Sequence, residues 1–433
     1  MKTLIPFLFT LVLTACGGGG GGGESSSPAS NAVSYKTVLN YNGFVPSLNT
    51  GHFTNDGATH IIATGWLSAS SSNNSTKIAP VKIFKAESSG LTDVTTQILG
   101  EAVSWSVQYS IIADFNKDGI DDIFLPGFMD VAPYSYKSVF YISRPGQSHA
   151  KTEYSTATYN HGATAGDVDN DGDIDVVSSS GHMWINDGGG NFSFKSAGTG
   201  MNGNGVCIAD FNNTGRSQVL ITDIYTDAQF SPISDSMIFE LDNNLNPTQT
   251  YTLPVPYFDR GNLGLTQTVF GVEYSHDVSC AVSDVNSDGL LDIVIISGYN
   301  GGGKRSKMQL YLNQGNFVFT DATDSNIINY NTSTHSSYIP KFIDFNGDGH
   351  KDIWLMHFDW ENINPNQLWL NNGSGTFNQS NIITAKISAF GKETSADSNY
   401  IAPAMPIKIN NVWYLIVSSM TNGVLNLAIK TFS

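Results

Sequence analysis

The residues with the clearest chemistry form an acidic turn that leads into an apolar segment. In Asp167-Val-Asp169-Asn-Asp171-Gly172-Asp-Ile-Asp175, carboxylates stand at positions 1, 3, 5 and 9 of the loop, and position 7 can offer its backbone carbonyl. Hard oxygen ligands at this spacing suit Ca²⁺, and a glycine at position 6 permits the sharp turn. The sequence therefore predicts a calcium loop here.

The same motif recurs three times. Its side chains at positions 1, 3, 5 and 9 are Asp114, Asn116, Asp118 and Asp122; Asp284, Asn286, Asp288 and Asp292; and Asp344, Asn346, Asp348 and Asp352. An EF-hand would need a Glu at position 12 and an outgoing helix. Position 12 is Leu125, Ser178, Ile295 or Leu355 instead, and β-branched and aromatic residues follow position 9. We therefore expect each loop to be the turn of a β-hairpin.

Weaker copies extend the series. The turn at residues 210–218 keeps one carboxylate and contains Arg216, whose positive charge argues against a metal, and the turn at 52–60 has less ligand chemistry still. A turn at Asn410-Asn411 has no acid at all. These turns start at 52, 114, 167, 210, 284, 344 and near 405, and a period of this size indicates a repeat architecture of seven units.

Each unit has room for two more strands after its loop. A third strand ends in Asn and Gly before an aromatic-led fourth strand, most clearly at residues 308–317 and 367–377. Four short antiparallel strands per unit are typical of a propeller blade. The last unit lacks its fourth strand, whereas residues 35–40 form an unassigned strand. The prediction is an all-β, seven-bladed β-propeller with calcium loops between first and second strands, closed by an N-terminal strand in the last blade.

These features carry a resemblance to a known family. The loops, with apolar lead-ins such as residues 161–166 and follow-ons such as 293–298, resemble FG-GAP or VCBS repeats, found in the integrin α-subunit propeller and in bacterial surface proteins. The resemblance covers roughly residues 35–433 and implies Ca²⁺ at the four residue sets named above. We expect about four structural ions, each offsetting the repulsion between carboxylates.

The first 34 residues have the character of a processing segment. Residues 1–15 contain Lys2 and an apolar stretch too short to span a bilayer, and Leu13-Thr-Ala-Cys16 resembles a bacterial lipobox. This implies lipid attachment at Cys16, a Gly/Ser-rich tether over residues 16–34 and a propeller over 35–433. By resemblance to Gram-negative lipoproteins, Gly17 favours the outer membrane. The alternative is a simple secretory signal with a chance cysteine.

The net charge and the cysteines give further information about ligands and compartment. The net charge of −17 discourages nucleic-acid binding, which needs clustered Lys and Arg. Cys207 and Cys280 precede the first Asp of their loops by three and four residues, so we expect them to face opposite sides of their strands. A disulfide is allowed in an oxidising compartment. We favour two buried, unpaired thiols that act as small hydrophobes.

The connections opposite the calcium turns are the candidate ligand face. They carry aromatic and charged residues, of which we select Trp66, Tyr134, Arg260, His357, Asp359 and Trp360. Aromatic side chains beside polar groups suit stacking on sugars or docking on a protein surface. The alternative is that many of them only cover loop backbone.

Three functions remain open. The first is a lipid-anchored, calcium-stabilised, monomeric binding or adhesion module for a glycan or a surface protein, with no catalytic residues. The second is a polysaccharide lyase or hydrolase with an acid/base pair drawn from the loop face, where His357, Asp359 and Glu361 lie close in sequence. The third is a structural scaffold in an envelope complex. The chain has no G-x-S-x-G or H-E-x-x-H motif, and we favour binding over catalysis.

Overall fold

The structure is a computed structural model in which the chain divides into two compact units, Met1–Ser34 and Tyr35–Ser433. It describes residues 36–40, 44–67, 79–101, 103–105, 109–127, 137–154, 162–196, 201, 203–224, 235–254, 275–299, 305–328, 333–334, 338–357, 367–380, 404–421 and 424–431. The first unit, with the predicted signal segment, Cys16 and the tether, lies outside these residues.

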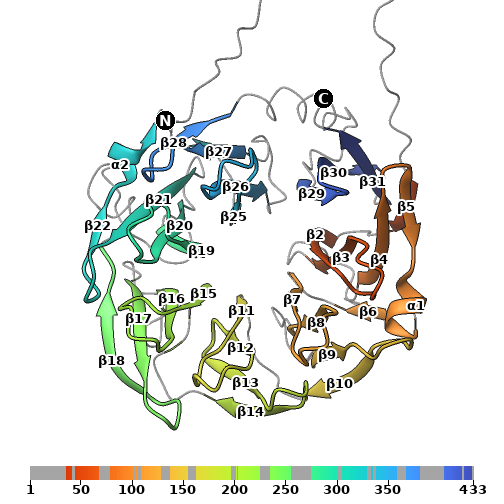
Figure 1. Cartoon of the computed structure of the whole chain (residues 1–433), viewed down its shortest axis with the longest axis horizontal. Helices are drawn as coiled ribbons and strands as arrows, with labels where there is room; N and C mark the ends of the chain where they lie inside the picture. Colours follow the sequence, from red (N-terminus) through yellow and green to blue (C-terminus); the bar gives the residue numbers. More distant parts are fainter. Residues whose placement is uncertain are drawn as a thin grey trace, which may run out of the picture. The chain divides into compact units, whose positions relative to one another are not determined.

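Six antiparallel sheets are each built from one continuous stretch of chain, and we call them blades 1 to 6 (Figure 1). Blade 1 contains β2 (Phe44–Gly51), β3 (His60–Leu67), β4 (Ala79–Glu87) and β5 (Gly90–Asp93). Blade 2 contains β7 (Ile111–Ala113), β8 (Asp122–Leu125), β9 (Ser138–Ile142) and β10 (Ala150–Tyr154). Blade 3 contains β11 (Ala163–Gly166), β12 (Asp175–Ser178), β13 (His182–Asn186) and β14 (Phe192–Ser196).

The second half of the chain continues the pattern. Blade 4 contains β15 (Gly205–Ala209), β16 (Gln218–Ile224), β17 (Asp235–Leu241) and β18 (Pro247–Thr252). Blade 5 contains β19 (Ser275–Ser283), β20 (Asp292–Tyr299), β21 (Arg305–Asn313) and β22 (Phe319–Asp321). Blade 6 contains β25 (Tyr338–Ile343), β26 (Asp352–His357), β27 (Gln367–Asn371) and β28 (Phe377–Gln379). In all six blades the predicted turn joins the first two strands.

The remaining sheet is composite, and we call it the closing sheet. It combines β29 (Ala404–Ile409), β30 (Val412–Thr421) and β31 (Val424–Thr431) with β1 (Lys36–Asn40), which pairs with β31. The predicted closure by an N-terminal strand is therefore confirmed. The prediction of seven blades was wrong in number, because the structure has six blades that are each continuous in sequence, and the remaining four strands form a composite sheet from the two ends of the propeller chain.

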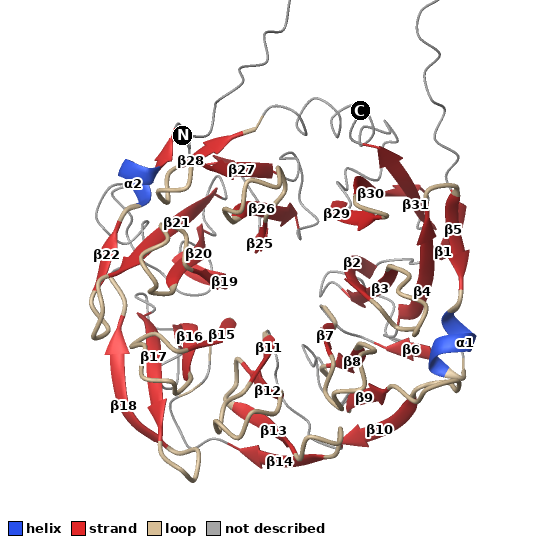
Figure 2. Cartoon of the chain, viewed as in Figure 1, coloured by secondary structure: helices blue, strands red, loops and turns tan. Residues whose placement is uncertain are grey.

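Short additional elements also depart from uniform four-stranded blades. β6 (Val103–Trp105) pairs with β4, β24 (Ser333–Thr334) pairs with β21, and β23 (Ile327–Ile328) pairs with β28 in parallel. Figure 2 shows the two short helices of the described residues, α1 (Thr95–Leu99) and α2 (Thr323–Asn326). These elements come from the long connections between blades, whose backbone finds partners on the nearest sheet.

The propeller arrangement follows from how the sheets contact one another. The first strands touch in order, from β2 to β7, β11, β15, β19 and β25, and β29 contacts both β26 and β2. Each second strand is buried on both faces. On β20, Ile293 and Ile295 pack toward blade 4, whereas Val294 and Ile296 pack toward blade 6. Alternate side chains of one strand thus serve two cores, which explains the unbroken apolar runs after each loop.

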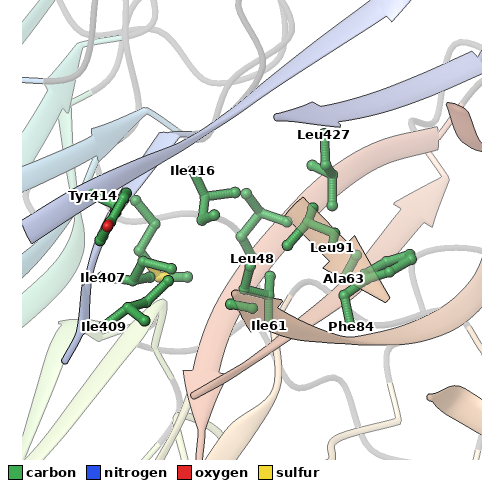
Figure 3. Packing of buried hydrophobic residues seen from close by; sticks show 12 residues of the cluster. Leu48, Ile61, Ala63, Phe84, Leu91, Ile407, Ile409, Tyr414, Ile416 and Leu427 are labelled. Carbon is green, nitrogen blue, oxygen red and sulfur yellow. The ribbon is translucent and has the colours of Figure 1, made fainter. Parts of the chain in front are cut away.

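The closing sheet is joined to blade 1 by one of these cores (Figure 3). Leu48, Ile61 and Phe84 of blade 1 pack there against Ile416 and Leu427 of the closing sheet. All five side chains are at most 2% exposed. Burying a large apolar side chain contributes about 1.5–3 kcal/mol, so this interface holds the composite sheet firmly to its neighbour.

Cys207 and Cys280 form a disulfide with a Cα–Cα distance of 6.2 Å, so the preference for two free thiols was wrong. Cys207 lies on β15 and Cys280 on β19, the first strands of blades 4 and 5. Both contribute to the core between these blades. Opposite faces of successive sheets point toward each other, so the predicted opposite orientation is what brings the sulfurs together.

In the part of the chain that the structure describes, no helix is long and apolar enough to cross a membrane.

Candidate metal centre

The loops share a backbone geometry that their sequence requires. In blade 2, Asp114 accepts the N–H of Asp118 on Oδ1 at 3.0 Å and that of Gly119 on Oδ2 at 2.9 Å. Gly119 has φ 84°, and Lys117 at position 4 has φ 59°. Position 4 is left-handed in the other motif loops too, at Asn170, Asn213, Ser287 and Gly347. The first Asp therefore closes a turn with two left-handed residues, at positions 4 and 6.

The position 9 carboxylate anchors each loop to its blade. Asp122 is fully buried, and its Oδ2 accepts the Phe115 N–H at 2.8 Å while its Oδ1 accepts the Ser143 N–H at 2.6 Å. Asp175, Asp292 and Asp352 are likewise buried and make the equivalent pair of bonds. Burial raises the pKa of Asp175 to about 7 and those of Asp122 and Asp292 to about 6. This residue therefore has a structural role whether or not it binds a metal.

The blade 3 loop differs from the others in a way that suits a cation. One oxygen each from Asp167, Asp169 and Asp175 lies within 4.8 Å of the other two, and no other loop of the described residues brings three acidic side chains this close. Asp167 Oδ2 accepts the Gly172 N–H at 3.0 Å, but its Oδ1 is buried without a hydrogen-bond partner. A buried, unpaired carboxylate oxygen is costly, and a divalent ion would satisfy it.

Electrostatics in the same loop agree with this interpretation. Burial, followed by the nearby Asp171 carboxylate, raises the pKa of Asp169. Asp171 itself, which the motif predicts as a ligand, lies outside the group of three. Its Oδ1 accepts the Asp173 N–H at 2.9 Å. Asp173 in turn forms an ion pair with Lys117 from the loop of blade 2.

The three loops with Asn at position 3 satisfy more of their own oxygens. Asn116, Asn286 and Asn346 donate their side-chain N–H to the aspartate at position 5, at 3.3, 2.9 and 2.7 Å. The first Asp of each loop has both carboxylate oxygens hydrogen-bonded to backbone N–H groups. An asparagine amide at position 3 can donate this hydrogen bond to the position 5 aspartate. Asp169, at position 3 of the blade 3 loop, cannot, because an ionised carboxylate has no proton to donate.

The loops of blades 4 and 1 have lost most of the acidic residues of the motif. Other polar side chains make hydrogen bonds inside these two loops instead. In blade 4, Gln218 at position 9 accepts the Phe211 N–H on Oε1 at 2.7 Å. Its Nε2 donates to Asn212 Oδ1 at 3.0 Å and to the Arg216 carbonyl at 2.6 Å. These acceptors are the position 3 and position 7 oxygens that would face a metal, so the Gln218 amide closes this loop without one.

In blade 1, His60 stands at position 9 and accepts the Phe53 N–H on Nδ1 at 3.3 Å. Lys85 donates to Asp56 Oδ2 at 2.7 Å. The Lys85 ammonium lies beside the position 5 carboxylate and, through this hydrogen bond above all, holds the pKa of Asp56 well below its usual range. A protein cation thus neutralises the acid that remains in this loop.

The sequence analysis missed a set of asparagines that link neighbouring blades. Asn186, Asn313 and Asn371 stand at the end of the third strand, and each is at most 3% exposed. Their side-chain N–H groups donate to the carbonyls of Phe115, Phe211 and Val285, at 2.7, 2.8 and 2.8 Å. Each acceptor is position 2 of the loop in the preceding blade. The signal was present as Asn-x-Gly at the same place in three units, but it suggested only a turn.

The predicted ligand face cannot be assembled from the described residues. Tyr134, Arg260, Asp359 and Trp360 lie outside them, as do the side chains of Trp66 and His357. The backbone positions of Trp66 and His357 fall within β3 and β26 rather than in the predicted connections. These strands run further than expected because their partners, β2 and β25, extend along them to Trp66 and His357.

A comparison with known protein families identifies the repeat. The FG-GAP-like repeat family matches residues 167–221 and 284–355, so the chain carries FG-GAP-like repeats as predicted. None of the curated proteins with which the chain was compared matches it.

Solved structures with a similar arrangement include the V. cholerae biofilm matrix protein Bap1, at 10% identity and a TM-score of 0.35, with 92% of this chain and 91% of that chain covered. The Trypanosoma rangeli sialidase is similar at 12% identity and a TM-score of 0.39, over 92% of this chain and 59% of the sialidase.

Proposed function

We propose that the protein is an exported, lipid-anchored β-propeller that is stabilised by calcium and binds a glycan or another protein at the cell surface. The observation that carries the calcium part is the group of three carboxylates in blade 3, one of which, Asp167, has a buried and unpaired Oδ1.

The chain's own residues define what the ion does. Asp167, Asp169 and Asp175 would hold it in blade 3, and the equivalent residues of the loops starting at Asp114, Asp284 and Asp344 would hold further ions. The ion supplies positive charge that offsets repulsion between carboxylates, so its role is structural. Asp175 also anchors the backbone of Val168 and Asn186, so a metal there would couple the loop to the second and third strands.

Export is supported by the disulfide as well as by the N-terminal segment. A Cys207–Cys280 bridge between two blades persists in an oxidising compartment and is rare in the cytosol. Export could be tested by expressing the full chain and its Cys16→Ser variant in a Gram-negative host. We expect the former in the outer-membrane fraction with the added mass of a diacylglyceryl group. Equal distribution and equal mass of both forms would exclude the anchor.

The calcium proposal is tested by thermal unfolding in 10 mM CaCl₂ and in EDTA. For a dissociation constant of about 10⁻⁴ M, binding at one site adds about 2.7 kcal/mol to the free energy of unfolding. Asp167→Asn should lose much of this increment. Asp210→Asn is the matched control, because Asp210 starts the blade 4 loop with both oxygens bonded to backbone N–H groups. A melting temperature that is the same with Ca²⁺ and with EDTA would refute the proposal.

Binding is tested by incubating the protein with a panel of polysaccharides in Ca²⁺, measuring retention of the protein and then the chain length of the glycan. Retention on an intact glycan would support the binding module and direct mutagenesis to Trp360 and Arg260. Shortened chains would replace the proposal by the second candidate, a lyase or hydrolase on the loop face. An absence of both would leave a protein as the partner, to be sought by cross-linking at the cell surface.

A further inference from the structure

Three blades are connected through their first strands by a short chain of polar groups. Lys341 on β25 of blade 6 donates from Nζ to Asn49 Oδ1 at 3.0 Å, and Asn49 lies on β2 of blade 1. Asn49 Nδ2 donates to the carbonyl of Ser110 at 2.9 Å, just before β7 of blade 2. The Lys341–Asn49 bond spans 292 positions of sequence and joins two blades that are not neighbours along the chain.

The Ser110 carbonyl fixes the orientation of the Asn49 amide. With Nδ2 toward Ser110, Oδ1 points to Lys341 and also accepts the Thr50 N–H at 3.0 Å. An asparagine amide carries two N–H donors, so one remains beside the bond to Ser110. A lysine ammonium carries three, so two remain beside the bond to Asn49. Among the contacts of the described residues, three donors of this pair are therefore unused.

Lys341 is half-buried, and its charge balance differs from that of Lys307, the buried lysine of the described residues. Lys307 is 4% exposed and lies 3.3 Å from the carboxylate of Asp324. Lys341 makes no ion pair within the described part of the chain, and burial alone lowers its pKa to about 8. At neutral pH the group is still an ammonium ion, yet its only described acceptor is a neutral amide. A half-buried charge without a counter-ion still loses part of its hydration, so the site favours an anion.

Both side chains of this contact, Lys341 and Asn49, are in part accessible to solvent. Their strands are the first strands of blades 6 and 1, the two blades that β29 of the closing sheet contacts. A ligand group that enters here would meet donors from two blades at once, which favours a group with several acceptor oxygens.

We propose that Lys341 and Asn49 form an anion site that binds an oxyanion, such as a carboxylate or a sulfate group, between the first strands of blades 6 and 1. The two remaining Lys341 donors and the remaining Asn49 donor bind its oxygens. The oxyanion can come from a free inorganic ion or from an acidic sugar, and both offer the same oxygens to these donors. The site does not depend on whether the protein binds a glycan elsewhere.

The test measures the melting temperature of the purified chain in sodium sulfate, sodium glucuronate and glucose, with NaCl added to a constant ionic strength. We expect a rise of about 2 °C with sulfate or glucuronate at tenfold excess over the dissociation constant, and none with glucose. A response to sulfate alone identifies a free inorganic ion as the ligand, and a response to glucuronate identifies the acidic sugar. No rise above the NaCl reference with either anion would overturn the proposal.

Two variants assign the response to the residue. Lys341→Met keeps the aliphatic stem and removes the charge, so the anion response should disappear. Lys307→Met is the matched control, because it removes a buried lysine that already has a carboxylate partner, and it should keep the response. Lys341→Arg retains the charge and should keep at least part of it. If Lys341→Met responds to the anions like wild type, the proposal is refuted. If that variant does not fold, wild type and Lys341→Arg are titrated with glucuronate in a calorimeter. The absence of any heat of binding to either protein then refutes the proposal.

Discussion

Replacing Asn371 should weaken the junction between blades 5 and 6 more than any surface change nearby. Its Nδ2 donates to the carbonyls of Val285 and Lys351, at 2.8 and 3.2 Å. Its Oδ1 accepts the N–H groups of Gly373 and Gly375, at 3.0 and 3.2 Å. The side chain is 3% exposed, so Asn371→Ala leaves several buried polar groups without partners.

The magnitude follows from those four bonds. A hydrogen bond contributes about 0.5–1.5 kcal/mol net, and an unpaired buried carbonyl costs about 1–3 kcal/mol. We expect Asn371→Ala to lower the free energy of unfolding by about 3 kcal/mol. Asn371→Asp should cost more at pH 7, because a carboxylate would face the carbonyl oxygens of Val285 and Lys351. Its cost should decrease at acidic pH, where the protonated carboxyl can donate.

The assay is urea unfolding in Ca²⁺ followed by tryptophan fluorescence, since Trp184, Trp354 and Trp369 are fully buried and report on the core. Asn372→Ala is the matched control. Asn372 is exposed and only caps the same turn, through the N–H groups of Ser374 and Thr376. If Asn371→Ala unfolds at the same urea concentration as Asn372→Ala, the link between the blades has no energetic importance and our reasoning fails.

Three further predictions concern other features of the propeller. Replacing both Cys207 and Cys280 by Ser should lower the free energy of unfolding by about 4 kcal/mol, because the bridge closes a loop of 73 residues. Wild type unfolded with reductant should match this variant. An unchanged urea midpoint in both would contradict the structure. Gln218→Glu should lower the free energy of unfolding by about 2 kcal/mol, because the amide donates two hydrogen bonds within the blade 4 loop and a carboxylate donates none. If the variant and wild type have the same melting temperature in EDTA, Gln218 does not have this role. The Lys341 pKa is lowered from 10.5 to about 8, so the neutral form is favoured on folding and stability is lost as pH falls from 10.5 to 8. Lys341→Met should therefore be more stable than wild type at pH 7, by at most about 3 kcal/mol, and the difference should shrink between pH 8 and 10.5; a constant difference across this range would exclude titration of Lys341 as its cause.

Much of the fold could be predicted because local signals determine it. Strands β8, β12, β20 and β26 begin at position 9 of their loops, where the acidic spacing ends and the apolar run starts. Asn410 and Asn411 have φ of 50° and 63°, the left-handed pair that a two-residue hairpin turn requires. Local sequence carries both signals, because a turn and the strand after it depend on residues close together.

Contacts between blades could not be predicted in the same way. The predicted orientation of Cys207 and Cys280, on opposite faces of their strands, agrees with the disulfide between them. Spacing within one unit, however, does not say how the next unit is placed beside it. Asn313 illustrates the same limit, because its partner is a carbonyl 102 positions earlier in the chain. For the four acidic loops, the motif predicted metal binding equally in every copy. The difference in blade 3 depends on one unpaired oxygen of Asp167, which only atomic positions reveal.

We expect the pairing of β1 with β31 to be a late step in folding. Lys36 lies opposite Leu427, about 390 positions away, whereas the strands of blades 1 to 6 find partners within a few tens of residues. The entropy of closing a loop grows with its length, here by about 2.5 kcal/mol relative to a hairpin of about 20 residues. We therefore expect blades to form before the ring closes. Until β1 binds, the edge of β31 is unpaired, and a second chain could add its own N-terminal strand there. The same strand that completes one molecule thus provides a route to domain-swapped chains when it is displaced.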